Sequence, residues 1–497
     1  MTYSHDRAAG VLLAQACGDA LGVPYEFGPA LPDSFTPVMA GGGPFGFAPG
    51  EYSDDTSMAV CIAEVARTGA DLTTDAALDE IAERFLAWAA VAKDVGSQTR
   101  AVFGHTHRSS GPRGAAMLAA SREHAAAHPG RVGNGALMRT AIVGLTDLDD
   151  RDATASAARA VAELTHADPL GAESCVLWSE AVRLAVTSGR LDLLAGLDLL
   201  PEARRDQWRA WIDAATGVDP RTFARNGFTV HALQAAWAAI TWTDIPELDA
   251  TAGTFPAQHL QLALANAVRA GDDTDTVAAI AGGLLGAVWG WSAIPAHWSR
   301  NVHGYGGHRA RGLITLGLHT AQRGQGDEQS WPTGRHMITR DYDDAPVISA
   351  VHPHDDGVVL GTYRSAPHGC DAVVSLCRVG AGDHADIPPG DHLEVRLLDS
   401  EVTHDNPHLE HVLADTAAAI KALRDEGKTV FVHCVAAQQR TPSVGVAYSR
   451  LLGVPAGQAQ DDMRRALPGL RGRGPLWDAA ARVSTWDGPS TARLSRP

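Results

Sequence analysis

The hydrophobic pattern of the chain changes once, at about residue 321, and this change constrains the fold more than any other feature. From residue 5 to about 320, apolar residues recur at helical spacing, and alternating runs of Val, Ile and Thr are scarce. Residues 321–335 are rich in Gly, Gln and Pro, which is typical of a linker. Residues 336–497 combine short β-like runs with helical segments. We therefore expect a multidomain protein, with an all-α domain at 5–320 followed by an α/β domain at 336–497.

Length, charge and cysteine usage narrow the class of protein further. A chain of 497 residues exceeds what one hydrophobic core usually organises. The net charge of -17 at pH 7 argues against an extended polyanion as partner, because phosphate backbones are bound by clustered Lys and Arg. No signal peptide, membrane-spanning run or CxxC pair is apparent. We expect a cytoplasmic protein without disulfides or membrane association, and a monomer, because the chain is long enough to cover its own cores.

Two acidic clusters stand at the starts of apolar helical runs in the first domain. They are Ser53-Asp54-Asp55-Thr56 and the segment at residues 272–276, Asp-Asp-Thr-Asp-Thr. Hydroxyl and carboxylate oxygens at this density are hard ligands that suit Mg²⁺. Helix capping is the alternative, because Ser, Thr and Asp are favoured at N-caps and the helix dipole attracts negative charge there. Each cluster alone fits both interpretations.

Several segments, taken in order, resemble the ADP-ribosylglycohydrolase family of the dinitrogenase-reductase-activating glycohydrolase type. The resemblance covers nearly all of residues 8–318. It implies a helical domain that cleaves a glycosidic bond of ADP-ribose at a centre of two Mg²⁺ ions. The segments that carry it are residues 18–27, 53–56, 96–100, 133–139, 165–169, 272–276, 294–298 and 303–306.

The resemblance also implies a role for individual residues of the metal centre. Asp55 and Asp273 would lie on the side that activates water, and Glu26 would transfer a proton or gate the ligand. A metal pair could bind the ribose diol and lower the pKa of a bound water, as hydrolysis through an oxocarbenium-like transition state requires. Without this context, Glu26 would be interpreted as an ordinary surface glutamate. The implied metal ligands are Ser53, Asp54, Asp55, Asp273, Asp275 and Thr276.

Four further residues are implied to contact the substrate. Asn134, Gly135 and Met138 match the segment that lines the ADP-ribose groove, where glycines let backbone amides approach phosphate. His166 matches a histidine on the substrate side, although a single histidine near a helix end is more often structural. The expected partner is an ADP-ribosylated protein or a small-molecule ADP-ribose conjugate.

The second domain contains the pattern of a cysteine-dependent phosphatase. Cys434 follows the β-like run 429–433, and Arg440 stands six residues later, in a C-x5-R arrangement. A cysteine between a buried strand and a helix N-terminus is favoured as a thiolate nucleophile, and the loop amides with Arg440 can hold a phosphate. Thr441 supplies a hydroxyl beside them. A bare C-x5-R pattern is weak, but the preceding strand and the neighbouring hydroxyl strengthen it.

Residues 346–453 resemble the dual-specificity and tyrosine phosphatase superfamily. The resemblance implies an aspartate as general acid about 30 residues before the cysteine, and Asp399 matches that setting, with Asp405 as the second choice. Either aspartate could equally be a turn residue. The family usually has Gly where this chain has Ala437. If the position requires positive φ, alanine costs roughly 1 kcal/mol or more, and the domain would be a slow phosphatase or a phosphate-binding module.

Together these patterns predict a two-domain hydrolase that removes or breaks down ADP-ribose conjugates. The C-terminal domain would then dephosphorylate a phosphoprotein or a phosphorylated ADP-ribose product. Two alternatives stay open. The first domain could be a reader that binds ADP-ribose without cleaving it, and the second could recruit phosphorylated partners without catalysis.

Overall fold

The computed structural model describes residues 4–327, 329–337, 339–365 and 369–483, which form two compact units. The first unit comprises the described residues of Met1–Asp244, Leu260–Ile294 and Asn301–Gly326. The second unit comprises those of Ile245–His259, Pro295–Arg300 and Asp327–Pro497. The second unit therefore includes two short segments that precede the predicted C-terminal domain in the sequence.

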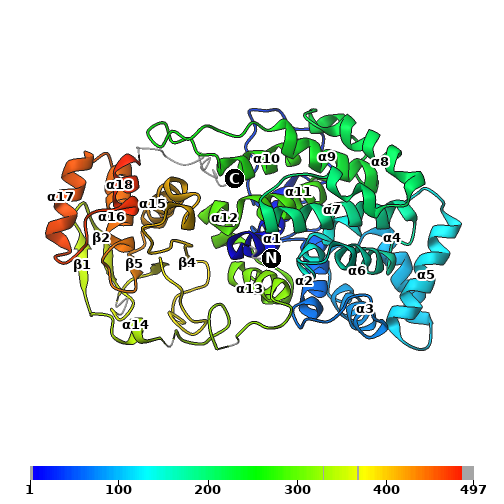
Figure 1. Ribbon diagram of the computed structural model, residues 1–497, viewed down its shortest axis with the longest axis horizontal. Helices are drawn as coiled ribbons and strands as arrows, with labels where there is room; N and C mark the ends of the chain where they lie inside the picture. The colour runs from blue at the N-terminus through cyan, green and yellow to red at the C-terminus, as the bar shows by residue number, and fades with distance from the viewer. Residues whose placement is uncertain (1–3, 328, 338, 366–368, 484–497) are drawn as a thin grey trace. The chain divides into compact units, whose positions relative to one another are not determined.

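The first unit is helical, as the spacing of its apolar residues predicts (Figure 1). Short 3-10 turns join many of the helices. The α-helices up to the end of this part of the chain are α1 (His5–Gly22), α2 (Asp54–Ala66), α3 (Asp75–Ala89), α4 (Ser97–Arg108), α5 (Arg113–Ala127), α6 (Arg151–Glu163), α7 (Pro169–Ser188), α8 (Glu202–Ala215), α9 (Thr229–Trp242), α10 (Gln258–Arg269), α11 (Thr274–Trp289), α12 (Ala296–Asn301) and α13 (Ala310–Ala321).

Helices α1 and α11 pack against each other so closely that their backbones touch. A Cβ atom on Gly10 would lie 2.6 Å from the carbonyl oxygen of Gly286, and a Cβ on Gly22 would collide with the backbone of Asp275. The helices therefore run antiparallel, and glycine is needed at both contacts because any side chain would separate them. This contact places the C-terminal end of α1 beside the first turn of α11.

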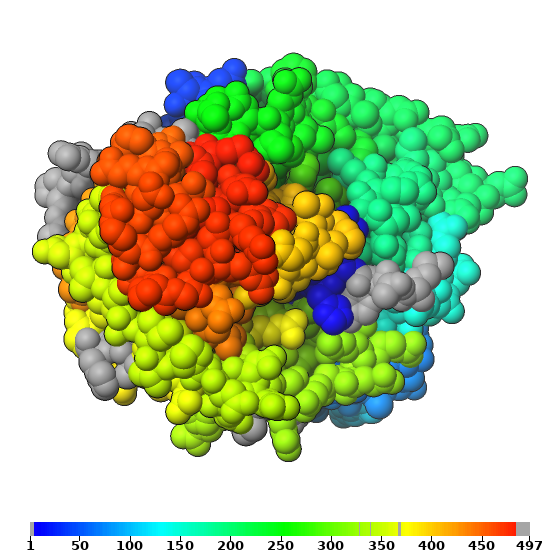
Figure 2. Space-filling model, turned by 60° about the vertical axis from the view of Figure 1, so that its left-hand side comes forward, coloured from blue at the N-terminus to red at the C-terminus, as the bar shows by residue number. Residues whose placement is uncertain are grey.

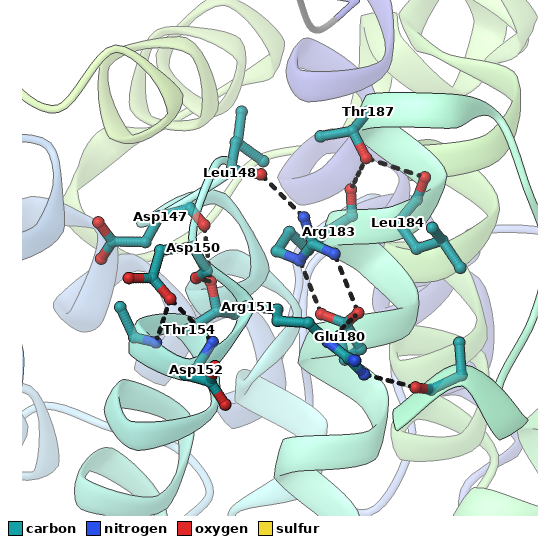
Figure 3. A network of polar contacts seen from close by, with 12 residues as sticks. Asp147, Leu148, Asp150, Arg151, Asp152, Thr154, Glu180, Arg183, Leu184 and Thr187 are labelled. Atoms are coloured by element: carbon teal, nitrogen blue, oxygen red, sulfur yellow. Dashed lines mark hydrogen bonds and ion pairs between the residues drawn. The ribbon is translucent and has the colours of Figure 1, made fainter. Parts of the chain in front are cut away.

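Helices α6 and α7 are joined by a buried ion-pair network (Figure 3). The carboxylate of Glu180, on α7, contacts Arg183 at 2.7 Å and Arg151, on α6, at 3.2 Å. Arg183 also donates to the carbonyl oxygen of Leu148 at 2.8 Å. Because buried charges are tolerated when they are paired and hydrogen-bonded, this network fixes α6 against α7. The connection between these two helices contains His166.

The second unit contains a five-stranded sheet in the order β1-β2-β5-β3-β4. Strands β1 and β2 pair antiparallel, whereas β2, β5, β3 and β4 pair parallel. The buried strands β3 and β5 are rich in Val, as expected where a parallel sheet is covered on both faces. The strands are β1 (Ser349–His352), β2 (Asp355–Thr362), β3 (Ala372–Ser375), β4 (His392–Glu394) and β5 (Val430–Cys434).

Among the described residues after 335, five helices accompany this sheet, so the mixed α/β character expected for the last third is confirmed. The segment of α17 and α18, orange to red, gathers on one face of the second unit (Figure 2). No helix among the described residues is long and apolar enough to cross a membrane. The helices are α14 (Arg340–Asp343), α15 (Leu409–Asp425), α16 (Arg440–Leu451), α17 (Ala456–Ala466) and α18 (Pro475–Arg482).

The early segment 295–300 makes specific contacts within the second unit. Arg300 forms ion pairs with Asp391 at 2.9 Å and with Glu426 at 2.6 Å. The backbone N–H of Ala296 donates to the buried carboxylate of Asp415 at 2.8 Å. These polar contacts, rather than an apolar periodicity, hold the segment 295–300 in this unit, which explains why the hydrophobic pattern did not predict it.

Candidate functional site

The acidic clusters do stand at helix N-termini, but their side chains do not cap those helices. Ser53 is the N-cap residue of α2 and Asp273 that of α11, and neither side chain makes a capping hydrogen bond. Asp19, on α1, takes this role for α2, because its carboxylate accepts from the N–H groups of Ser53 at 2.8 Å and Thr56 at 3.0 Å. The Ser53 hydroxyl instead donates to Asp55 at 2.9 Å. The capping alternative therefore does not describe the side chains of either cluster.

The carboxylates of α1, α2, α11 and the turn after α1 converge into two groups. One group is Asp19, Asp55 and Asp275, and the other is Glu26, Asp273 and Asp275. Within each group, one oxygen of every carboxylate lies within 4.8 Å of the others. Oxygen ligands at these separations fit hard divalent cations. Because Asp275 belongs to both groups, the two candidate cation positions are adjacent.

The electrostatic state of these carboxylates also fits a cation. Burial, reinforced by the neighbouring negative charges, raises the pKa of Glu26 to about 9 and holds those of Asp55 and Asp275 well above the usual range. Asp55 Oδ1 and Glu26 Oε2 are buried and have no hydrogen-bond partner among the described residues. Unpaired buried carboxylate oxygens are costly unless a cation or a proton is present. The donor set therefore fits one or two divalent cations.

A cavity of about 450 Å³ opens over this acidic cluster. That volume is within the range of small-molecule sites. Ser53 and Asp55 lie outside its lining, and Ser53 and Asp54 border a second, smaller cavity of about 110 Å³. The site residues expected from the sequence that line the larger cavity are Glu26, Asp54, Asn134, Gly135, Met138, His166, Asp273, Asp275 and Thr276.

Asn134 connects the cavity wall to the acidic cluster. Its Nδ2 donates to Asp273 at 2.8 Å and to the carbonyl oxygen of Asn226 at 3.0 Å. The fully buried Asn226 in turn accepts from the N–H of Asp273 at 2.9 Å and donates to the carbonyl oxygen of Gly271 at 3.0 Å. These bonds fix the entry to α11 and the orientation of the Asp273 carboxylate.

His166 lies directly against the glycine-containing segment of the wall. A Cβ atom on Gly135 would lie 3.0 Å from His166 Cε1, so this contact requires the absence of a side chain. Gln98 bridges the two elements, because it accepts from the N–H of Gly133 at 3.2 Å and donates to the carbonyl oxygen of Thr165 at 3.1 Å. Burial lowers the pKa of His166 well below its usual value, so its ring is neutral.

Three acidic or amide residues of this site were not singled out from the sequence. Asp19 lies inside the apolar helix α1, and a fully buried aspartate in such a run is itself a signal. Asp94 lines the cavity, and burial together with the charge of Asp273 raises its pKa to about 6. Asn226 stands in a turn between helices, where nothing in the local sequence distinguishes it from an ordinary turn asparagine.

The C-x5-R segment forms a loop between β5 and α16. Cys434 ends β5 and is buried, and Arg440 begins α16. Within the described chain, the backbone N–H groups of residues 435–439 donate no hydrogen bond to the protein. Ala437 has φ of 52°, in the left-handed region where alanine is strained. The loop therefore offers backbone N–H groups that can donate to a ligand, and its backbone is strained at Ala437.

The remaining predicted residues of this loop have different surroundings. Arg440 donates to the carbonyl oxygen of Leu376 at 2.9 Å, and its Nε lies 3.7 Å from Asp399. Asp405 instead accepts from the hydroxyl of Ser400 at 2.6 Å. Of the two candidate acids, Asp399 thus forms an ion pair with Arg440. The buried Thr441 hydroxyl donates to the carbonyl oxygen of Gly361 at 3.3 Å.

Comparisons with known proteins concern mainly the first unit. A family model described as ADP-ribosylglycohydrolase matches residues 2–329. The ADP-ribosylarginine hydrolase Tri1 of Serratia proteamaculans is 26% identical over 318 residues, which cover 59% of this chain and 75% of that protein. The ADP-ribosyl-(dinitrogen reductase) glycohydrolase of Rhodospirillum rubrum is 28% identical over 306 residues, covering 59% and 89%. The crystal structure of human DUSP28 aligns with 28% of this chain and 94% of its own, at 22% identity and a TM-score of 0.24.

Proposed function

Because this chain belongs to the ADP-ribosylglycohydrolase family, we propose that its first unit hydrolyses the glycosidic bond of ADP-ribose conjugates with the help of two Mg²⁺ ions. One observation carries the proposal: two groups of carboxylates share Asp275 beside a single cavity of ligand size. A protein that only bound ADP-ribose would have no need to bury this many carboxylates together. Their mutual repulsion is a cost that a catalytic metal centre explains.

The ligand set would combine the residues expected from the sequence with Asp19. Asp55, Asp273 and Asp275 supply carboxylates to the two groups, and Asp54 borders the cavity beside them. Bound Mg²⁺ would supply Lewis acidity, which lowers the pKa of water and binds ribose hydroxyls. Ser53 and Thr276 add hydroxyl oxygens at the starts of α2 and α11.

Glu26 is the candidate for proton transfer. Its raised pKa keeps a proton on the carboxyl group near neutral pH, and the side chain lines the cavity. A carboxylic acid in this state can protonate the leaving group of a glycosidic bond. The alternative role, gating of the ligand, predicts that a Glu26→Gln variant alters binding of ADP-ribose more than the rate of bond cleavage.

The wall opposite the carboxylates would bind ADP-ribose. Gly135 lets the backbone approach the ligand, Met138 adds an apolar surface, and Asn134 and His166 add polar groups. Among the relatives, Tri1 is named for ADP-ribosylarginine. An arginine linkage is therefore the first to test, and the acceptor would be a protein or a small molecule.

The deciding experiment measures Mg²⁺-dependent release of ADP-ribose from arginine-linked, serine-linked and small-molecule conjugates. The intact protein is compared with an Asp54→Asn/Asp55→Asn variant. Asp152→Asn is the matched control, because Asp152 is an exposed aspartate in the first turn of another helix, α6. Release that needs both the metal and the pair Asp54–Asp55 supports hydrolysis. Binding of ADP-ribose without release from any conjugate would favour the reader alternative.

A second activity is proposed for the loop that begins at Cys434. The unsatisfied N–H groups of residues 435–439 and the Arg440 guanidinium favour a phosphate ligand. In the proposed reaction, the Cys434 thiolate attacks phosphorus, the bond to the leaving oxygen breaks, and Asp399 protonates that oxygen. Water then releases inorganic phosphate from the cysteine. The substrate would be a phosphoprotein or a phosphorylated product of the first reaction.

This second proposal has its own test. Release of phosphate from an aryl phosphate, a phosphopeptide and phosphorylated ADP-ribose is measured for the intact protein and for Cys434→Ser. Comparison of Asp399→Asn with Asp405→Asn identifies the general acid, since only the true acid affects substrates with poor leaving groups strongly. Binding of inorganic phosphate without turnover would instead favour a recruiting module.

A further inference from the structure

Arg139 is fully buried beneath the cavity wall and has no ion-pair partner among the described residues. Its guanidinium donates to the carbonyl oxygen of Gly135 at 2.9 Å and to the Thr165 hydroxyl at 2.8 Å, and it stacks over the Phe85 ring at 4.8 Å. A buried cation without a counter-charge is costly. We therefore expect Arg139 to have a role beyond packing, such as the orientation of neighbouring groups.

The contacts of Arg139 determine the direction of the neighbouring hydrogen bond. Guanidinium groups only donate, so the Thr165 oxygen must accept from Arg139, and its own hydrogen is directed elsewhere. His166 Nδ1 lies 2.7 Å from that oxygen. A hydroxyl oxygen can accept two hydrogen bonds, but the Thr165 hydroxyl has no acceptor other than Nδ1 among the described residues. Nδ1 therefore accepts the hydroxyl hydrogen, which leaves the ring proton of the neutral His166 on Nε2.

The Nε2 atom of His166 is on the cavity side of the ring. His166 lines the cavity, and its Nε2 would lie 3.2 Å from a Cβ atom placed on Gly135. This nitrogen makes no hydrogen bond to any of the described residues, although the side chain is only 1% exposed. A buried donor without a partner, at the wall of a cavity, is suited to a ligand acceptor.

We propose that Arg139 and Thr165 are positioning residues that hold His166 as a neutral Nε2–H donor to an oxygen atom of ADP-ribose. The inference rests on the proposed function for the identity of the ligand. Arg139 acts at two points, because its second bond, to Gly135, fixes the glycine that the His166 ring touches. The orientation of the ring and the shape of the adjacent wall are thereby set by one buried cation.

The first test measures the Kd of ADP-ribose by calorimetry for three variants. Thr165→Val keeps the shape of the side chain and removes the hydroxyl, so the Kd should rise roughly three- to tenfold, the loss of one hydrogen bond. Thr165→Ser should bind as the intact protein does. Thr106→Val is the matched control, because it removes a buried helical hydroxyl that bonds only to its own helix, and it should leave the Kd unchanged.

A double-mutant cycle separates positioning from packing. If Thr165 acts through the histidine, Thr165→Val should have no further effect on the Kd in a His166→Ala background. KM should follow the Kd, while kcat changes less. An equal effect of Thr165→Val in both backgrounds would show a merely structural role and would overturn the proposal.

The second test does not depend on catalysis or on ADP-ribose. With ¹⁵N-labelled histidine rings, His166 is assigned by its loss in His166→Ala. Its Nδ1 should resonate as a hydrogen-bonded acceptor in the intact protein and should move toward the position of an unbonded acceptor in Thr165→Val. A protonated Nδ1 in the intact protein would refute the proposed hydrogen bond from the Thr165 hydroxyl to His166. A correct Nδ1 signal without any binding of ADP-ribose would instead refute the proposed function.

Discussion

The replacement Asp275→Asn should make the metal-free protein more stable while abolishing its activity. Asp275 is the one carboxylate common to both groups of candidate ligands. It is buried, and it accepts a hydrogen bond from the N–H of Thr276 at 2.9 Å, which an asparagine oxygen can also accept. The substitution therefore removes a negative charge while keeping the hydrogen bond from Thr276, and stability and function are expected to change in opposite directions.

The size of the effect follows from the separation of the carboxylates. Two unit negative charges 4.8 Å apart repel by about 3.5 kcal/mol at an effective dielectric constant of about 20. Uptake of protons by the raised-pKa carboxyl groups relieves part of this repulsion in the metal-free protein. The remaining relief should be about 1–3 kcal/mol, which raises the Tm by roughly 2–5 °C for a unit of this size.

Thermal unfolding in EDTA and in Mg²⁺, followed by circular dichroism, provides the assay. The intact protein should gain stability from Mg²⁺, whereas Asp275→Asn should start higher in EDTA and gain little. Asp6→Asn is the matched control, because Asp6 is a buried aspartate outside the cluster whose two oxygens accept from the N–H and from the hydroxyl of Ser292. An asparagine can accept only one of these bonds, so this replacement should lower the Tm. An Asp275→Asn protein less stable than the intact protein in EDTA would refute the reasoning.

Three further outcomes are expected. The folded-state pKa of Glu26, about 9, exceeds its ordinary value of 4.5. In EDTA, its contribution to the free energy of unfolding is therefore full below about pH 4.5 and is lost as the pH rises toward 9. Unfolding measured at a series of pH values should show this decrease in stability, and Glu26→Gln should make the decrease smaller. Gly135→Ala should raise the KM about tenfold or more with little change in Tm, because the added Cβ would crowd His166. Initial-rate kinetics provide the measurement, and an unchanged KM would contradict the prediction. Ala437→Gly should relieve the strain at φ 52° by up to about 1 kcal/mol and increase kcat/KM for aryl phosphates, whereas a slower enzyme would show that the alanine is the functional choice.

The sequence predicted what is periodic and local. Helical spacing and Val-rich runs indicated the helical first part and the sheet with its helices, because burial imposes those periods directly. Strand β4 was missed because three residues are too few to show a period. The segment 295–300 was missed because ion pairs such as Arg300 with Glu426 join residues far apart in the sequence.

The residues of the candidate site likewise fall into those that the local sequence predicts and those that only the folded structure reveals. Asp54, Asp55, Asp273 and Asp275 were found because dense clusters of acidic residues are visible in the sequence. Asn226 was not found, because its importance lies in three hydrogen bonds to residues 45 to 92 positions away. Candidate ligand residues can thus be recognised from their chemistry, whereas residues that orient them are recognised only once the backbone is folded.

Asp19 illustrates how an orienting residue can affect metal binding. An N-terminal helical turn normally uses its own Ser or Asp side chain to satisfy its free N–H groups. Here α1 supplies that carboxylate from outside α2, and the glycine contacts of α1 with α11 bring the first turn of α11 beside the same end of α1. The side chains of Asp54 and Asp55 are released from capping and are available to a cation. Asp19→Ala should therefore lower Mg²⁺ affinity as well as stability, whereas a loss of stability alone would assign Asp19 to the helix cap only.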